Sequence, residues 1–103
     1  MDYFYKKERD REVSRFFNKD TLDAWNKFNA ESFKEGKLTK KEKELIAVAC
    51  TYMTRCPWCI ESHTKKALKE GATKEEIAEV ISIAAALAAG ASMAHMNFAL
   101  DVK

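Results

Sequence analysis

The sequence predicts a single all-α domain of about five to six helices. Only one proline and three glycines stand among its 103 residues, which leaves little material for the turns between strands. Apolar residues recur at helical spacing along nearly the whole chain, and the good helix formers Ala, Glu, Lys and Leu are abundant. A chain of this length makes one domain of ordinary size, and a second domain does not fit.

Composition and charge narrow the classes of function. Hydrophobic residues make up 47% and charged residues 33% of the chain, a soluble globular balance. The net charge is +2, and Lys and Glu intermix instead of forming a basic stripe, so we expect no nucleic-acid partner. The start, "MDYFYKKERD", has no apolar run of signal-peptide length, and we expect a cytoplasmic protein.

The first part of the chain is expected to hold two helices. A peripheral N-terminal helix is expected within residues 1–18, covering about Glu8 to Phe17. A second helix should begin near Asp20 as N-cap and run to Glu35, with Gly36 as its stop. Its apolar residues Leu22, Trp25, Phe28 and Phe33 recur on or near one face, and the three aromatic ones are expected in the core.

Two further helices flank the only proline. "TKKE", Thr39 to Glu42, has the spacing of a capping box and opens a helix that must end before Pro57. Cys56 can then be the N-cap of the next helix, with Pro57 in its first position, where a missing N–H is harmless. That helix should run to Glu70 and stop at Gly71.

The last part of the chain is unusually apolar. A second capping box, "TKEE" at Thr73 to Glu76, should start a helix that Gly90 interrupts before a final segment ending near Leu100. From Ile77 onward this stretch is apolar almost all the way round. A membrane span would explain it, but the run is rich in alanine and contains Glu79, His95 and Asn97. A helix covered on one side by a second subunit explains it better, so we expect a homo-oligomer and no membrane partner.

The stretch "TRCPWCIESH" contains the residues that could take part in a reaction or bind a metal. Cys56 and Cys59 would lie at the start of a helix, where the helix dipole and unpaired N–H groups favour thiolate over thiol. His63 follows one turn after Cys59 on the same face and can exchange a proton with a thiol near neutral pH. An odd number of cysteines in a reducing compartment points to chemistry or metal binding rather than to a structural disulfide.

A histidine used in this way is usually oriented by a third group. Glu44 is the candidate, because a short turn between neighbouring helices could bring it beside His63. From periodicity alone, a solvated glutamate within "KKEKE" would be the simpler interpretation.

The spacing of these four residues, E-x11-C-x2-C-x3-H, resembles the alkylhydroperoxidase D (AhpD) core of the carboxymuconolactone decarboxylase family. The flanking text, "KEGKLTKKEKELIAVA" and "CPWCIESHTKKALKEGATKEEIAEVISIA", is similar to that family as well, and the resemblance spans about Phe28 to Leu100. It implies an all-helical oligomer, commonly a trimer or a hexamer.

The resemblance also implies roles for the four residues. Cys59 would attack a hydroperoxide, Cys56 would form the disulfide with it, and His63 and Glu44 would relay protons, with no cofactor and no metal. A dithiol or lipoyl-type reductant would restore the pair. The sequence departs from the pattern of the best-described peroxidases at Trp58, where they have a histidine. This difference bears on the expected rate of peroxide reduction.

Other interpretations stay open. Cys56, Cys59 and His63 could bind zinc with His95 or Cys50 as a fourth ligand, although no second CxxC or HxxxH follows. A family relative could instead decarboxylate a small lactone acid, or the chain could be a helical scaffold without activity. Taken singly, Cys50 is expected to be a small core residue, and His95 a packed or interface residue.

Overall fold

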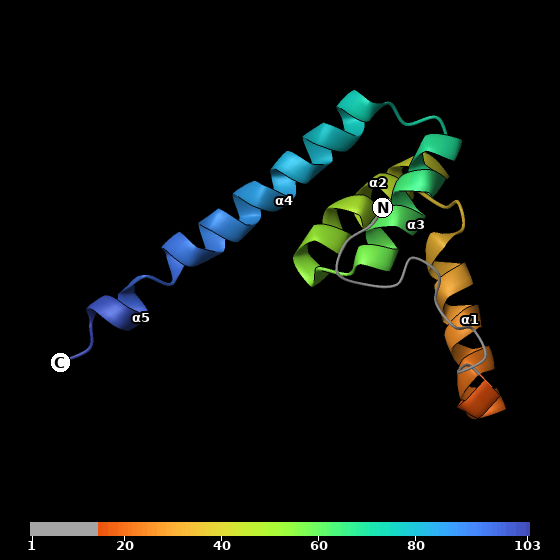
Figure 1. The fold of residues 1–103 in the computed structure, drawn as a ribbon, viewed down its shortest axis with the longest axis horizontal. Coiled ribbons are helices and arrows are strands. Elements are labelled where there is room, and N and C mark those ends of the chain that lie inside the picture. Colours follow the sequence, from red (N-terminus) through yellow and green to blue (C-terminus); the bar gives the residue numbers. More distant parts are fainter. Residues whose placement is uncertain (1–14) are drawn as a thin grey trace.

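Five helices follow one another along residues 15–103, the part of the chain that the computed structural model describes (Figure 1). They are α1 (Lys19–Phe33), α2 (Lys40–Thr54), α3 (Pro57–Lys69), α4 (Lys74–Ala94) and the single turn α5 (Asn97–Leu100). This confirms the all-α fold class, with four full helices in the described part of the chain. The helix expected over 8–17 lies for the most part outside the described residues, and it stays a prediction.

The helix starts follow from side chains that cap free backbone N–H groups. Thr39 and Thr73 each begin a complete capping box, which confirms the predicted starts of α2 and α4. The expected N-cap of α1 at Asp20 is wrong by two residues. Asn18 is the cap, and its side-chain oxygen accepts from the Asp20 N–H at 2.9 Å, so Asp20 lies in the first turn near the positive end of the dipole.

The connection around the proline also has the predicted form. α2 ends at Thr54, and Arg55 adopts the left-handed conformation with φ of 59°. Cys56 is the N-cap of α3, and Pro57 is its first residue. α3 ends at Lys69, and Gly71 follows with φ of 94°, a conformation that glycine adopts without a steric penalty.

The core lies between α2, α3 and α4. Its buried members come from all three helices and the loop before α4: Val48, Ala67, Ala72 and Ile77. α1 packs more sparsely, against α2. The Lys43 ammonium of α2 donates to the carbonyls of Ser32 and Lys34, at 2.9 and 2.6 Å, and so ties down the end of α1.

Several aromatic and apolar side chains expected to be packed are exposed in the single chain. Trp25 and Phe28 are 58% and 66% exposed, so their assignment to the core is wrong for the single chain. Near the end of the chain, Met93 and Met96 are also exposed, at 63% and 46%, although helical spacing would let them pack. The helical spacing correctly placed apolar residues on one face of α1, but only part of this face is covered within the described chain: Phe33 packs on His63, whereas Trp25 and Phe28 are exposed.

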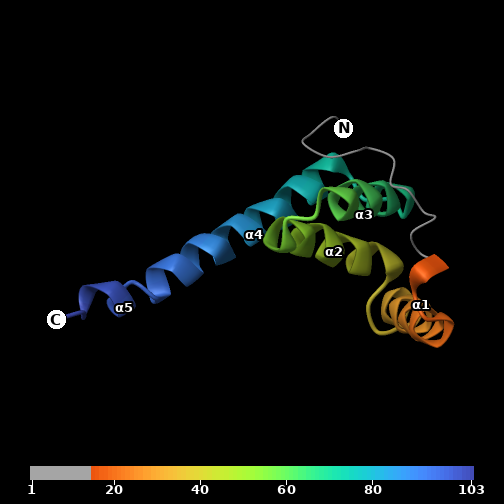
Figure 2. The same ribbon diagram turned by 60° about the horizontal axis from the view of Figure 1, so that its bottom comes forward.

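α4 leaves the body of the molecule and projects from it (Figures 1 and 2). The expected interruption at Gly90 is wrong, because α4 continues through it to Ala94, and the break falls at His95 and Met96 instead. A glycine inside a helix costs only about 1 kcal/mol, which its neighbours can offset. By length and composition alone, the segment Lys74–Leu100 could cross a membrane.

Candidate functional site

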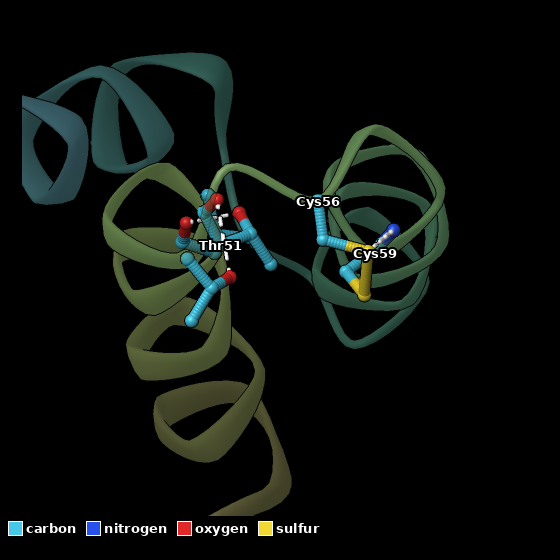
Figure 3. The surroundings of a disulfide bond; sticks show 5 residues. Thr51, Cys56 and Cys59 are labelled. Carbon is cyan, nitrogen blue, oxygen red and sulfur yellow. Dashed lines mark hydrogen bonds between the residues drawn. A yellow bond between two sulfur atoms is a disulfide. The ribbon is translucent and has the colours of Figure 1, made fainter. Parts of the chain in front are cut away.

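The two cysteines of the CxxC motif lie at the start of α3. The structure joins Cys56 and Cys59 by a disulfide, with their Cα atoms 5.2 Å apart (Figure 3). The Cys59 backbone N–H donates to the Cys56 sulfur at 3.3 Å, so Cys56 caps the helix with its side chain. The predicted placement of both residues is confirmed.

This position favours negative charge on sulfur when the pair is reduced. The first N–H groups of a helix have no partner within it, and the helix dipole adds partial positive charge at the same end. A thiolate on Cys56 would accept the hydrogen bond that the Cys59 N–H already makes. The fold therefore supplies the electrostatics that a reactive thiol pair needs.

His63 and Glu44 meet across the interface between α3 and α2. The His63 Nδ1 lies 2.7 Å from the Glu44 Oε2, as the short turn between the helices led us to expect. Glu44 is buried, with 8% of its surface exposed, so the interpretation as a solvated glutamate is wrong. An ionised carboxylate can only accept, so Nδ1–H is the donor, and Nε2 remains free to take a proton.

Phe33 completes the surroundings of the imidazole. Its ring stacks on the His63 ring with a centroid distance of 5.1 Å and an interplanar angle of 16°. Lys43 donates to the carbonyls of Ser32 and Lys34, on either side of Phe33, and so anchors the backbone that carries this ring. Neither Phe33 nor Lys43 was predicted from the sequence to be part of the site.

An apolar cavity of about 420 Å³ opens beside these groups. Cys59 and His63 both line it, together with residues of α1, α2 and the loop between them, among them Phe33, Leu38, Ile46 and Cys50. Cys50 is exposed, so its expected place in the core is wrong. A volume of this size accommodates a small molecule. Of the two cysteines in the disulfide, Cys59 is the one that lines the cavity.

The geometry of the described residues gives little support to the alternative of a metal site. Within residues 15–103, no three His, Cys, Asp or Glu side chains are grouped so as to hold a metal ion. Sulfurs joined to one another are also not free to bind zinc. His95 lies at the end of α4, where its Nδ1 pairs with the Ala91 carbonyl at 2.7 Å and its ring stacks on Phe98.

The fold and the site together define a class of protein: a helical domain in which a CxxC pair begins one helix and a histidine on that helix pairs with a glutamate of its neighbour. The chain matches the carboxymuconolactone decarboxylase family over residues 19–101. It belongs to that family and is AhpD-like.

Two relatives of similar sequence come from bacteria. An uncharacterized protein in the cox locus of Paracoccus denitrificans is 51% identical over 78% of this chain and 72% of its own length. An uncharacterized protein of Cupriavidus necator is 38% identical over 64% of this chain. The match spans only 58% of that second relative.

Solved structures share the fold. A protein from Methanobacterium thermoautotrophicum superposes with a TM-score of 0.76 and 35% identity, over 81% of this chain and 95% of that one. A protein from Thermotoga maritima gives 0.67 and 28%, over 89% and 86%. A carboxymuconolactone decarboxylase family protein from Legionella pneumophila gives 0.61 and 33%, over 74% and 70%.

Proposed function

We propose that the protein is a thiol–disulfide oxidoreductase that reduces hydroperoxides, alkyl hydroperoxides among them, with electrons from a dithiol or lipoyl-type donor. The observation that carries this proposal is that a cysteine of the disulfide and the histidine of the Glu–His pair line the same cavity. Cys59 of the disulfide lines it beside His63, and His63 is held from behind by Glu44.

In the first half of the cycle, His63 accepts the proton of the Cys59 thiol. The thiolate attacks the terminal oxygen of the hydroperoxide and the O–O bond breaks, leaving a sulfenic acid on Cys59. The departing alkoxide takes the proton from His63 and becomes an alcohol. Glu44 stabilises the imidazolium while it carries that proton.

In the second half, the Cys56 thiol attacks the sulfenic sulfur of Cys59. The S–S bond forms, and hydroxide leaves and combines with the thiol proton as water. The structure holds the pair in this oxidised form. A dithiol donor then gives two electrons and two protons to the disulfide by exchange, and becomes a disulfide itself.

The apolar lining supports an organic hydroperoxide as substrate. Phe33, Leu38 and Ile46 would contact an alkyl group, and its burial would contribute about 25 cal/mol per Å² of apolar area. The placement of Cys59 in this wall supports its role as the attacking sulfur, while Cys56 acts as its partner.

The test is dithiol-dependent consumption of an alkyl hydroperoxide by purified protein. Cys59→Ser should reduce the rate to background, because a serine hydroxyl is not a nucleophile under these conditions. Ser62→Ala, an exposed change on the same helix, should leave the rate unchanged. An undiminished rate in Cys59→Ser would refute the proposal.

Lactone decarboxylation is the second candidate, favoured by the family match alone. Carbon dioxide release from a small lactone acid that survives replacement of both Cys56 and Cys59 would support it. A chain active in neither assay would favour the helical scaffold.

We further propose that the working form is a cytoplasmic homo-oligomer, a trimer or a hexamer, with no membrane or nucleic-acid partner. The exposed apolar side chains of α1 and α4 support an interface, because single chains rarely leave so many together in water. The thiol chemistry fits a reducing compartment, where a dithiol donor is regenerated.

A further inference from the structure

A second cavity, of about 390 Å³, lies where the end of α1, the start of α2 and the end of α3 meet. Figures 1 and 2 both show these three ends on the same side of the molecule. Phe33 and Glu44 form part of its wall, so the Glu44–His63 pair has the apolar cavity on the His63 side and this second cavity on the Glu44 side. We call it the lysine cleft, since its walls include Lys34, Lys40, Lys66 and Lys69.

The charges in the lysine cleft are not balanced. Its walls carry two carboxylates, Glu44 and Glu70, and Glu44 is already engaged by His63. Lys34 pairs with Glu31 at 2.7 Å. In the described part of the chain, Lys40, Lys66 and Lys69 form no ion pair within 4.0 Å.

Some lysines of this protein are paired, whereas Lys27, Lys37 and Lys74 form no ion pair in the described part of the chain and do not line the cleft. Lys19, Lys41 and Lys65 each lie within 3.1 Å of a carboxylate oxygen. Lys40, Lys66 and Lys69 line one concavity from two helices, and like charges gathered there repel one another, so a bound anion would relieve that repulsion. The arrangement therefore differs from an ordinary solvated lysine surface in its concave shape and in the excess of lysines over carboxylates along its walls.

We propose that the lysine cleft binds a small molecule through a phosphate or carboxylate group. Its volume falls within the range of small-molecule sites. Ammonium groups bind phosphate and carboxylate as point charges, and the Phe33 ring offers an apolar surface to the rest of the ligand. The site is separate from the cysteines, so the proposal holds whether or not the redox function does.

The test is an NMR titration of the full chain with inorganic phosphate at fixed pH and fixed ionic strength, with chloride as the balancing anion. We expect saturable shifts of the backbone amides of the lysine cleft. The double variant Lys66→Gln and Lys69→Gln should weaken binding by about tenfold, because each exposed ion pair contributes up to about 1 kcal/mol. All three side chains changed in the test and control lie on the surface, so the variants should fold.

Lys65→Gln is the matched control. It removes the same charge from the same helix at a residue outside the lysine cleft, paired with Glu61, and it should bind phosphate as the unchanged chain does. Equal weakening in the control and the double variant, or shifts that never saturate, would overturn the proposal. A parallel titration with succinate distinguishes the ligand: tighter binding than phosphate indicates a carboxylate, and weaker binding a phosphate.

Discussion

His63 is held on two sides, and this makes its second nitrogen available for chemistry. Glu44 fixes Nδ1 from α2, and Phe33 covers a face of the ring from α1. A histidine fixed in this way loses little entropy when it takes a proton from a neighbouring thiol. Residues of α1 and α2 therefore position one imidazole of α3.

Glu44→Gln should slow hydroperoxide reduction by about a hundredfold, the lower end of what acid–base catalysis contributes. The amide keeps the size of the side chain but cannot offset the charge of an imidazolium. A small oxidant should still convert Cys56 and Cys59 to their disulfide in this variant. That result would show that the variant is folded and has lost only the proton transfer through Glu44 and His63. The measurement is the steady-state rate beside a mass-spectrometric disulfide assay.

Glu79→Gln supplies the control, since Glu79 is exposed on α4 and has no part in the site. An equal loss of rate in both variants would contradict the role assigned to Glu44.

At the residue scale, the sequence predicted what local helical geometry determines. Cys56, Cys59 and His63 lie within two turns of one helix, so their spacing alone places them together. Glu44 was a candidate because a short turn joins the two helices, but periodicity alone favoured a solvated side chain, since it cannot show which glutamate a neighbouring helix will bury. Phe33 and Cys50 were not predicted as cavity residues, since their positions depend on how α1 packs on α2.

At the scale of the elements, α2 and α4 are joined by a salt bridge between Lys41 and Glu76, with 2.9 Å between Nζ and Oε2. Glu76 also accepts from the Thr73 backbone N–H in the capping box of α4. The hydrogen bond from Lys41 and the one from Thr73 hold the pKa of the Glu76 carboxyl below its ordinary value of 4.5. The backbone and side chain of Thr39 lower the pKa of Glu42 in the same way.

A lowered pKa in the folded state makes stability depend on pH. The contribution of Glu76 is present above its unfolded pKa and is lost as the pH falls through the lowered folded value. We therefore expect the urea midpoint to fall as the pH is taken from about 6 to about 3, and Glu76→Gln to make that fall smaller. Glu79→Gln, a change of the same kind on the same helix, should leave the fall unchanged, and a fall of equal size in Glu76→Gln would contradict this assignment.

The elements were predicted best where a capping signal stands in the sequence. Both capping boxes, Pro57 and Gly71 mark boundaries that the structure confirms. The break expected at Gly90 was wrong, because the low helix propensity of one glycine is a weak signal inside an alanine-rich segment, and alanine is an excellent helix former. The N-cap of α1 was misplaced because Asn18 and Asp20 are both good capping residues, and the sequence alone does not choose between them.

At the scale of the whole molecule, the single chain is extended. Its radius of gyration is 17.3 Å and its extents are 52 × 35 × 33 Å, whereas a compact domain of this size has a radius of about 13 Å. The projecting α4 accounts for the longest dimension (Figure 1). Its side chains Ile83 and Leu87 are 56% and 63% exposed, which suits a helix that packs against another subunit.

We expect sedimentation to give a mass that is a multiple of 11.8 kDa, three or six chains, at micromolar concentration. Leu87→Glu should shift the distribution toward single chains, because a buried unpaired carboxylate opposes association. Ser62→Glu, which adds the same charge to an exposed position on α3, is the comparison. A mass of one chain for the unchanged protein would contradict the expected oligomer.

The most direct measurement follows the two sulfurs of Cys56 and Cys59 through one cycle by alkylation and peptide mass spectrometry. We predict that the reduced chain, given one equivalent of an alkyl hydroperoxide, loses two alkylatable thiols at these positions, and that a dithiol restores both while Cys50 stays alkylatable throughout. A chain in which these two cysteines remain free after hydroperoxide, or in which either joins Cys50 instead, would contradict the account.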